Sequence, residues 1–215
     1  MTRQNLLVNA ANLLLIGLLL GNAACEEDGG SDNSGHDFGV NNPDLVVALG
    51  DSITHGYGLA GSESYPAQLG AQTGRPVINS GADGERSSGG LGRVNSVLNQ
   101  HKPGFLLILY GSNDLIFGAD LNGIVGNLRG IIQAAKANQT IPIIATVPPA
   151  FPYHDFIAQG VVDLNPLIQA MAAEEGVAVA NVFNALNNPA LFQSDGLHPT
   201  AEGAGKIASA FAGKL

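Results

Sequence analysis

From residue 44 onward the sequence alternates short apolar runs with segments of helical periodicity, and this alternation constrains the fold more than any other feature. The runs 105–110 and 141–147 are almost entirely apolar, as expected for strands that are buried on both faces. Within 141–147, Pro142 lacks an N–H group, so it is expected at the start of its strand or at an unpaired position. Alternating strands and helices predict an α/β protein with a parallel sheet covered by helices on both faces. The expected strands are 45–49, 76–79, 105–110, 141–147 and 177–182, and the expected helices are 64–73, 88–100, 121–138, 163–175 and 200–213.

The composition excludes several classes of partner. The chain has 215 residues, of which 45% are hydrophobic, enough for the core of one domain. The formal net charge is −9 and there is no basic stripe, so binding to nucleic acid is not expected. Tryptophan is absent and aromatic residues make up 6%, which argues against an extended stacking platform for polysaccharides. We therefore expect a small-molecule or lipid ester as the partner. A monomer is the expected state, although the composition does not determine it.

The amino-terminal 43 residues differ in character from the rest of the chain. Residues 1–24 begin Met-Thr-Arg, contain a short apolar stretch and end in two alanines before Cys25, the single cysteine. This order is typical of a secretory signal peptide, and small residues before a lone cysteine resemble the lipobox of bacterial lipoproteins. Residues 25–43 are acidic and rich in Gly, Ser and Asn, so a flexible tether is expected before one domain at 44–215. The predicted product is an exported protein lipidated on Cys25 and anchored to a membrane facing the periplasm or the cell surface; a soluble periplasmic or secreted protein is the alternative.

The loops that follow the strands carry most of the reactive side chains. All strands of a parallel sheet point the same way, so these loops converge on one edge, where α/β proteins bind their ligands. Each loop taken alone has an ordinary interpretation as a turn or a helix cap. The loops are Gly50-Asp51-Ser52, Asn79–Gly84, Gly111–Asp114, Pro148–Phe151 and, further along, Asp195–Pro199.

Together these loops supply the groups that acyl transfer requires. Ser52 offers a nucleophilic hydroxyl, and His198 offers an imidazole that can accept its proton. Asp195, three residues before His198, can turn back and hold the other ring nitrogen. The N–H groups of Ser52 and Gly84 and the side-chain amide of Asn113 can stabilise an oxyanion. This combination favours a serine hydrolase site whose rate rises as His198 loses its proton.

These loops resemble the sequence blocks of the GDSL or SGNH hydrolases over nearly all of residues 44–213. Gly50-Asp51-Ser52 is similar to the first block, 79–84 to the second, 111–114 to the third and 195–199 to the last. The resemblance implies a three-layer α/β/α sandwich with a five-stranded parallel, flavodoxin-like sheet. It also implies a carboxylic ester hydrolase without a cofactor.

Within this family, the segments 89–93 and 100–103 resemble the bacterial thioesterase I, lysophospholipase L1 and arylesterase group. That resemblance implies short to medium acyl esters, aryl esters, lysophospholipids or acyl thioesters as substrates. Two positions depart from the group: Ser112 replaces a common glycine, and Glu85-Arg86 replaces a common Asp-Thr. Both lie beside the expected oxyanion site, so they leave the choice of substrate open.

Other residues near these loops are expected to have supporting roles. Asp51 is expected to shape the turn that presents Ser52, and His55 has no evident carboxylate to orient it as a base. Neither the spacing of the histidines nor any glycine-rich loop predicts a metal or nucleotide site. The expected walls of an acyl pocket are Ile116 on one side and Pro149 and Phe151 on the other. The ordinary interpretation of Ile116 is helix core, and a rigid connector explains the loop of Pro149 and Phe151 equally well.

Two other functions fit the same pattern. A carbohydrate O-acetylesterase would use the same catalytic residues, although the scarcity of aromatic residues argues against it. A non-catalytic surface lipoprotein would retain the fold without turnover, although retention of every catalytic group argues against it. A receiver-like domain is a further structural alternative, but the first strand lacks the paired acidic residues of that fold.

Overall fold

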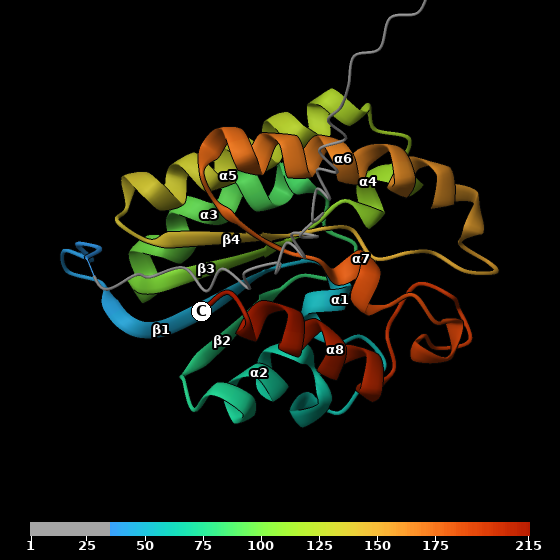
Figure 1. Ribbon diagram of the computed structural model, residues 1–215, viewed down its shortest axis with the longest axis horizontal. Coiled ribbons are helices and arrows are strands. Elements are labelled where there is room, and N and C mark those ends of the chain that lie inside the picture. Colours follow the sequence, from blue (N-terminus) through green and yellow to red (C-terminus); the bar gives the residue numbers. More distant parts are fainter. Residues whose placement is uncertain (1–34) are drawn as a thin grey trace, which may run out of the picture.

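The structure is a computed structural model that describes residues 35–215 (Figure 1). The expected signal peptide at 1–24, the lipidation site Cys25 and most of the expected tether therefore lie outside the described residues. No helix in the described part of the chain is long and apolar enough to cross a membrane.

A five-stranded parallel sheet forms the middle layer, as the sequence predicts. The spatial order β2-β1-β3-β4-β5 is that of flavodoxin-like folds, in which the chain reverses direction across the sheet between β1 and β3. Ligands of such folds bind at this reversal, outside the carboxyl ends of the strands. The strands are β1 (Asn42–Gly50), β2 (Val77–Gly81), β3 (Pro103–Leu109), β4 (Ile141–Ala145) and β5 (Ala178–Ala180).

Helices cover both faces of the sheet, which completes the α/β/α sandwich (Figure 1). One face carries α3 (Ser87–His101), α5 (Leu121–Ala137) and α6 (Ala158–Glu175), and the other carries α2 (Tyr65–Thr73) and α8 (Ala201–Ala212). The shorter helices are α1 (Ser52–His55), α4 (Ser112–Ile116), α7 (Val182–Ala185) and three 3₁₀ turns at Gly61–Glu63, Asp155–Ile157 and Pro189–Leu191.

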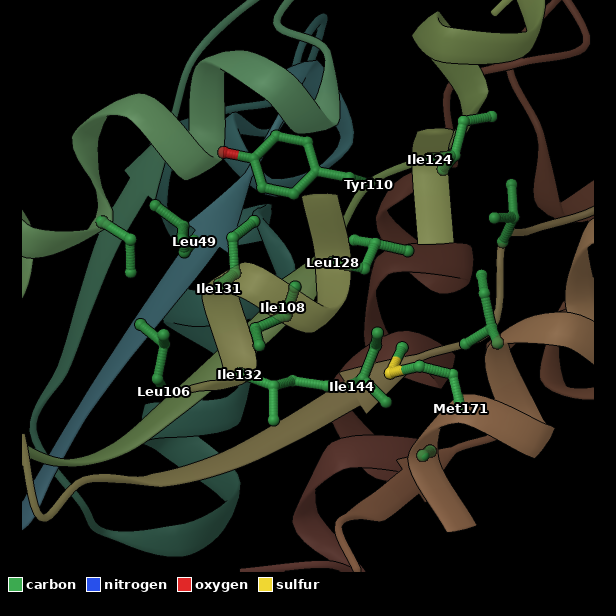
Figure 2. Close-up of a cluster of buried hydrophobic side chains, with 14 of the residues drawn as sticks. Leu49, Leu106, Ile108, Tyr110, Ile124, Leu128, Ile131, Ile132, Ile144 and Met171 are labelled. Atoms are coloured by element: carbon green, nitrogen blue, oxygen red, sulfur yellow. The ribbon is translucent and has the colours of Figure 1, made fainter. Parts of the chain in front are cut away.

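The strands are buried on both faces because successive side chains point in opposite directions. In β1, Val47 and Leu49 join the core under α3, α5 and α6, whereas Val46 and Ala48 join the core under α2 and α8. Figure 2 shows Leu49 of β1 in the first of these clusters, among side chains of β3, β4, α5 and α6. The two cores explain why the sequence shows continuous apolar runs instead of alternation.

The boundaries of β4 and α6 show how prolines are accommodated. Pro142 pairs with Leu106 of β3, but pairing with β5 begins only at Ile143, so the missing N–H lies before that ladder. Helix α6 begins at Ala158, five residues before the predicted start at 163, and tolerates Pro166 on its exposed face. The other long helices agree with their predicted ranges to within one or two residues.

The last part of the expected tether is packed against the domain instead of being solvated. Buried Asn41 donates a hydrogen bond to the carbonyl of Asn138 (2.5 Å), in the turn before β4. His36 remains exposed, and its Nε2 lies 3.1 Å from the carbonyl of Gln139. Residues 36–41 therefore contact the amino-terminal edge of the sheet, opposite the edge reached by the loop after β1.

Candidate active site

Ser52 is the first residue of α1, directly after β1, as the sequence predicts for a strand-end loop. The side chain of Asp51 caps this helix by accepting a hydrogen bond from the N–H of Ile53 (2.9 Å). A side chain at Gly50 would collide with Thr54 and with the carbonyl of Leu109, so only glycine permits this sharp turn. The strand, the tight turn and the cap together place the Ser52 hydroxyl at the edge of the sheet.

Ser52, His198 and Asp195 form one hydrogen-bonded chain. Oγ of Ser52 lies 2.9 Å from Nε2 of His198, although the two residues are 146 positions apart. On the other side of the ring, Nδ1 of His198 lies 2.6 Å from Oδ2 of Asp195. With the ring proton on Nδ1, the imidazole donates to Asp195 and accepts from the Ser52 hydroxyl. This is the arrangement in which a serine can be activated as a nucleophile.

The loop that carries Asp195 and His198 is fixed by its own backbone. Oδ1 of Asp195 accepts hydrogen bonds from the N–H groups of Leu197 (2.9 Å) and His198 (3.0 Å). Partial burial raises the pKa of Asp195, but the hydrogen bonds from the His198 ring and from these N–H groups outweigh it, and the net pKa is lowered. Asp195 is therefore held as a carboxylate, the form that can stabilise a neighbouring imidazolium.

The three predicted oxyanion donors follow β1, β2 and β3, which are neighbours in the sheet. Gly84 has a φ of +70°, and an added Cβ would point into open space, so its backbone can be approached closely. The amide of Asn113 is buried and donates to Oδ2 of Asp51 and to the carbonyl of Glu85, both at 3.2 Å. The structure thus brings Asn113 to the same edge as Ser52 and orients its amide nitrogen through Asp51.

Asp51 is an unusual group in this site because it is almost completely buried. Burial raises its pKa to about 7; the negative charge of Asp114 adds to the increase, and hydrogen bonds from Ile53 and Asn113 oppose it. The backbone N–H of Ile53 and the side-chain amide of Asn113 are both donors, so the local hydrogen bonding suits the carboxylate while the burial does not. Asp51 therefore does more than the turn formation predicted from the sequence, since it also holds Asn113.

A second polar network supports the loop that contains Gly84, and sequence reasoning missed it. Arg93 of α3 donates to both carboxylate oxygens of Glu85 (2.7–2.9 Å) and to the carbonyls of Ser80 and Gly50 (2.7 and 3.2 Å). The Tyr110 hydroxyl donates to Oε2 of Glu85 (2.6 Å), and burial together with that carboxylate raises the tyrosine pKa. These contacts tie the residue after Gly84 to the ends of β1, β2 and β3. The sequence marks Glu85 only as a departure from the family pattern, because its partners Arg93 and Tyr110 are distant along the chain.

His55 has a carboxylate partner, which corrects the sequence interpretation that none is available. Its Nδ1 lies 2.8 Å from Oδ1 of Asp83, and both side chains are about half exposed. The pair is separate from the Ser52–His198 contact, so the conclusion that His55 is not the base of this site is unaffected. Asp83 could not be identified beforehand because β2 must first bring it beside α1.

The predicted pocket residues have different surroundings. Ile116, at the end of α4, and Pro149, after β4, are both partly buried. The Phe151 ring packs against Phe192, with centroids 5.0 Å apart, and belongs to the core beneath α8. The N–H of Phe151 donates to the carbonyl of Gly196 (2.9 Å), so this loop supports the Asp195–His198 turn. The side chain of Phe151 thus has a packing role, and a role in binding substrate remains a prediction for all three.

Across residues 35–215, no group of three or more His, Cys, Asp or Glu side chains is arranged to hold a metal ion.

Comparisons with known proteins find relatives that are similar in sequence and in fold. The chain is 29% identical over 176 residues to "Thioesterase 1/protease 1/lysophospholipase L1" of Escherichia coli K12, covering 80% of this chain and 83% of that protein. It is also 29% identical over 181 residues to an arylesterase of Vibrio mimicus, covering 79% and 87%. A solved GDSL-like lipase from Bacteroides thetaiotaomicron superimposes with a TM-score of 0.67 at 26% identity, covering 83% and 91%.

A lipolytic protein of the G-D-S-L family from Desulfitobacterium hafniense shares the fold with a TM-score of 0.72 at 24% identity, covering 79% of this chain and 98% of that one. The model of the GDSL-like lipase/acylhydrolase family matches residues 48–206, which include all the strand-end loops described above. The chain therefore belongs to the GDSL-like lipase/acylhydrolase family.

Proposed function

We propose that this member of a family of carboxylic ester hydrolases is a serine esterase that forms an acyl-enzyme on Ser52. The observation that carries the proposal is the continuous chain from the Ser52 hydroxyl through both nitrogens of His198 to Asp195, with contacts of 2.9 and 2.6 Å. All of these groups come from one chain, so the proposed active form is a monomer.

In the proposed reaction, Oγ of Ser52 attacks the acyl carbonyl carbon while its proton passes to Nε2 of His198. The carbonyl oxygen becomes an oxyanion held by the N–H groups of Ser52 and Gly84 and by the Asn113 amide, which exchanges its hydrogen bond to the carbonyl of Glu85 for one to the oxyanion. The bond to the leaving alcohol breaks as His198 returns the proton to the alcohol oxygen. Water then attacks the acyl-enzyme with His198 again acting as base, releasing the acid and restoring Ser52.

The proposed substrates are short to medium acyl esters and aryl esters, with lysophospholipids and acyl thioesters as related candidates. The names of the relatives, thioesterase, lysophospholipase and arylesterase, support this range. Ile116 and Pro149 are proposed to line the acyl side of the site because they follow β3 and β4 at the catalytic edge.

Active-site labelling tests the nucleophile. A fluorophosphonate probe is expected to label the protein, and labelling should disappear in Ser52→Ala. Ser209→Ala is the matched control: Ser209 is exposed on α8, bonds to neighbouring residues there and should have no influence on labelling. Persistent labelling of Ser52→Ala would exclude Ser52 as the nucleophile.

A substrate profile tests the specificity. Hydrolysis rates of p-nitrophenyl butyrate and hexanoate should exceed those measured on acetylated xylan. The reverse order would identify a carbohydrate O-acetylesterase, and absence of turnover on all of these substrates by folded protein would indicate a non-catalytic role.

We also propose that the protein is exported and lipidated on Cys25. The sequence pattern of residues 1–24 supports this, and the contacts of residues 36–41 bring the chain into the domain at the edge opposite Ser52. Mass spectrometry of the mature amino terminus should find a diacylglyceryl-modified Cys25; an unmodified terminus would favour soluble export.

A further inference from the structure

The imidazole of His198 has a third neighbour besides Ser52 and Asp195, and no step of the proposed reaction uses it. The ring of Tyr57 lies over the ring of His198, with centroids 4.6 Å apart and planes inclined by 35°. Tyr57 is 52% exposed, whereas the His198 side chain is only 12% exposed. The tyrosine thus covers the imidazole on the solvent side while remaining accessible itself.

The backbone of Tyr57 joins the two segments that carry the catalytic groups. Its N–H donates to the carbonyl of Ser52 (3.0 Å), which ties it to α1. Its carbonyl accepts a hydrogen bond from Nε2 of Gln193 (2.8 Å), and the N–H of Gln193 donates to the carbonyl of His198 (2.8 Å). The position of the Tyr57 ring is therefore set relative to both Ser52 and His198.

The hydroxyl of Tyr57 plays no part in these contacts. Among the described residues it makes no hydrogen bond, and only the aromatic face meets the imidazole. Whatever the side chain of Tyr57 contributes to His198 therefore comes from the ring, and phenylalanine should supply it equally well.

We propose that the aromatic ring of Tyr57 is a positioning residue for His198, which keeps the imidazole aligned between Ser52 and Asp195 and favours its protonated form during catalysis. This inference rests on the proposed function. The hydrogen bonds to Ser52 and Asp195 fix the two nitrogens, but they leave the ring free to tilt about the line joining them. Packing against Tyr57 removes that freedom, and the electron-rich face of the phenol attracts the positive charge that His198 acquires when it takes the serine proton.

The few groups around His198 allow the effect of the Tyr57 ring to be measured in a pH–rate profile. Within residues 35–215, the imidazole contacts Asp195 on its own loop, Ser52 of α1 and the ring of Tyr57 from the segment after α1. A further titratable side chain, His154, contacts the backbone of this loop, with its Nδ1 2.8 Å from the carbonyl of Asp195. The pair formed by His55 and Asp83 is a separate contact on the other end of α1. Replacing Tyr57 leaves the Asp195 carboxylate in place, so any change in the pH–rate profile reports the loss of the ring.

The test compares Tyr57→Leu with Tyr57→Phe on p-nitrophenyl butyrate between pH 5 and 9. Tyr57→Leu is expected to lower kcat by about 3- to 10-fold with little change in KM, since the ring acts on the chemical step. The acidic limb of its kcat/KM profile should move to lower pH by about half a unit, because the imidazolium loses a favourable neighbour. Tyr57→Phe should match the natural protein in kcat, KM and pH profile.

Three outcomes would overturn the inference: equal loss in both variants, a change confined to KM, or no change in Tyr57→Leu. If a lowered melting temperature shows that Tyr57→Leu is poorly folded, Tyr57→Met serves as a second non-aromatic variant. Histidine NMR provides an independent readout, since the signal that disappears in His198→Gln should lose its ring-current shift in Tyr57→Leu and retain it in Tyr57→Phe. Failure of the proposed function is distinguishable, because it would appear as retained activity in Ser52→Ala.

Discussion

Replacing Asp51 with asparagine is expected to stabilise the fold at neutral and alkaline pH and, at the same time, to impair catalysis. Asp51 is buried beside the nucleophile, and burial raises its pKa from 3.8 to about 7. Between these two values the folded protein retains a proton that the unfolded chain releases. The stability that the protonated carboxyl group of Asp51 gives the folded protein is therefore fully present below about pH 4. It is lost as the pH rises towards 7.

The size of the effect follows from the shift. A difference of about three pKa units corresponds to about 4 kcal/mol, at about 1.4 kcal/mol per unit. Asparagine has a similar shape and does not ionise, so Asp51→Asn should lack this pH dependence. The free energy of unfolding of the variant, relative to the natural protein, should rise by about 4 kcal/mol between pH 4 and pH 8.

Urea denaturation of both proteins at several pH values between 4 and 8 measures this difference. Asp120→Asn is a matched control, because Asp120 also caps a helix through its side chain but is exposed. Relative to the natural protein, the stability of the control should stay level over this range. Parallel stability curves for Asp51→Asn and the natural protein would refute the reasoning, because they would mean that Asp51 titrates alike in the folded and unfolded chain.

The same substitution should reduce activity. In the natural protein Asn113 donates to Oδ2 of Asp51. An asparagine at position 51 would present either an amide nitrogen or a reoriented oxygen to Asn113. Reorientation of Asn113 weakens one oxyanion donor, so kcat should fall by about 10-fold or more, short of the 10²–10³ typical of losing a donor outright. Stabilisation with loss of activity would identify Asp51 as a residue retained for function.

Other substitutions separate catalysis from stability. Asp195→Asn should lower kcat by roughly 10³-fold or more with little change in melting temperature, because asparagine cannot hold His198 in the required tautomer; unchanged kcat would contradict the Ser52–His198–Asp195 assignment. Gly84→Ala should cost about 1–2 kcal/mol in thermal unfolding, since its φ is +70°, and should also lower kcat. Tyr110→Phe should cost about 1–2 kcal/mol in urea denaturation, because Glu85 and Arg93 lose a buried hydroxyl partner; full stability would show that the network tolerates its loss.

Much of the architecture could be predicted from local sequence patterns. The apolar runs at 105–110 and 141–147 identified buried strands because a strand covered on both faces needs apolar residues at consecutive positions. Helix α5 was predicted almost to the residue because one amphipathic face repeats every 3.6 positions. The start of α6 was missed, since a 3₁₀ turn at Asp155–Ile157 leads directly into the helix and no side chain caps its first turn.

The residue types at the site were also available from the sequence. Strand ends in a parallel sheet lie at one edge, so Ser52, Gly84 and Asn113 could be expected there once the strands were identified. Asp195 and His198 are three positions apart, and one turn of backbone brings them together without help from the rest of the chain.

The sequence alone determined the order of strands and helices, the burial pattern and the local turn that pairs Asp195 with His198. Tertiary structure decided which distant segments meet: Ser52 with His198, Tyr57 over the imidazole and Arg93 with Glu85 and Tyr110. It also decided the protonation of Asp51, because a carboxyl group that follows a strand is ordinary in sequence and becomes unusual only when surrounding elements exclude water from it. The periodicity of apolar residues depends only on neighbours along the chain. The contact between Ser52 and His198, 146 residues apart, and the degree of burial depend on how the whole sheet and its helices pack around the site.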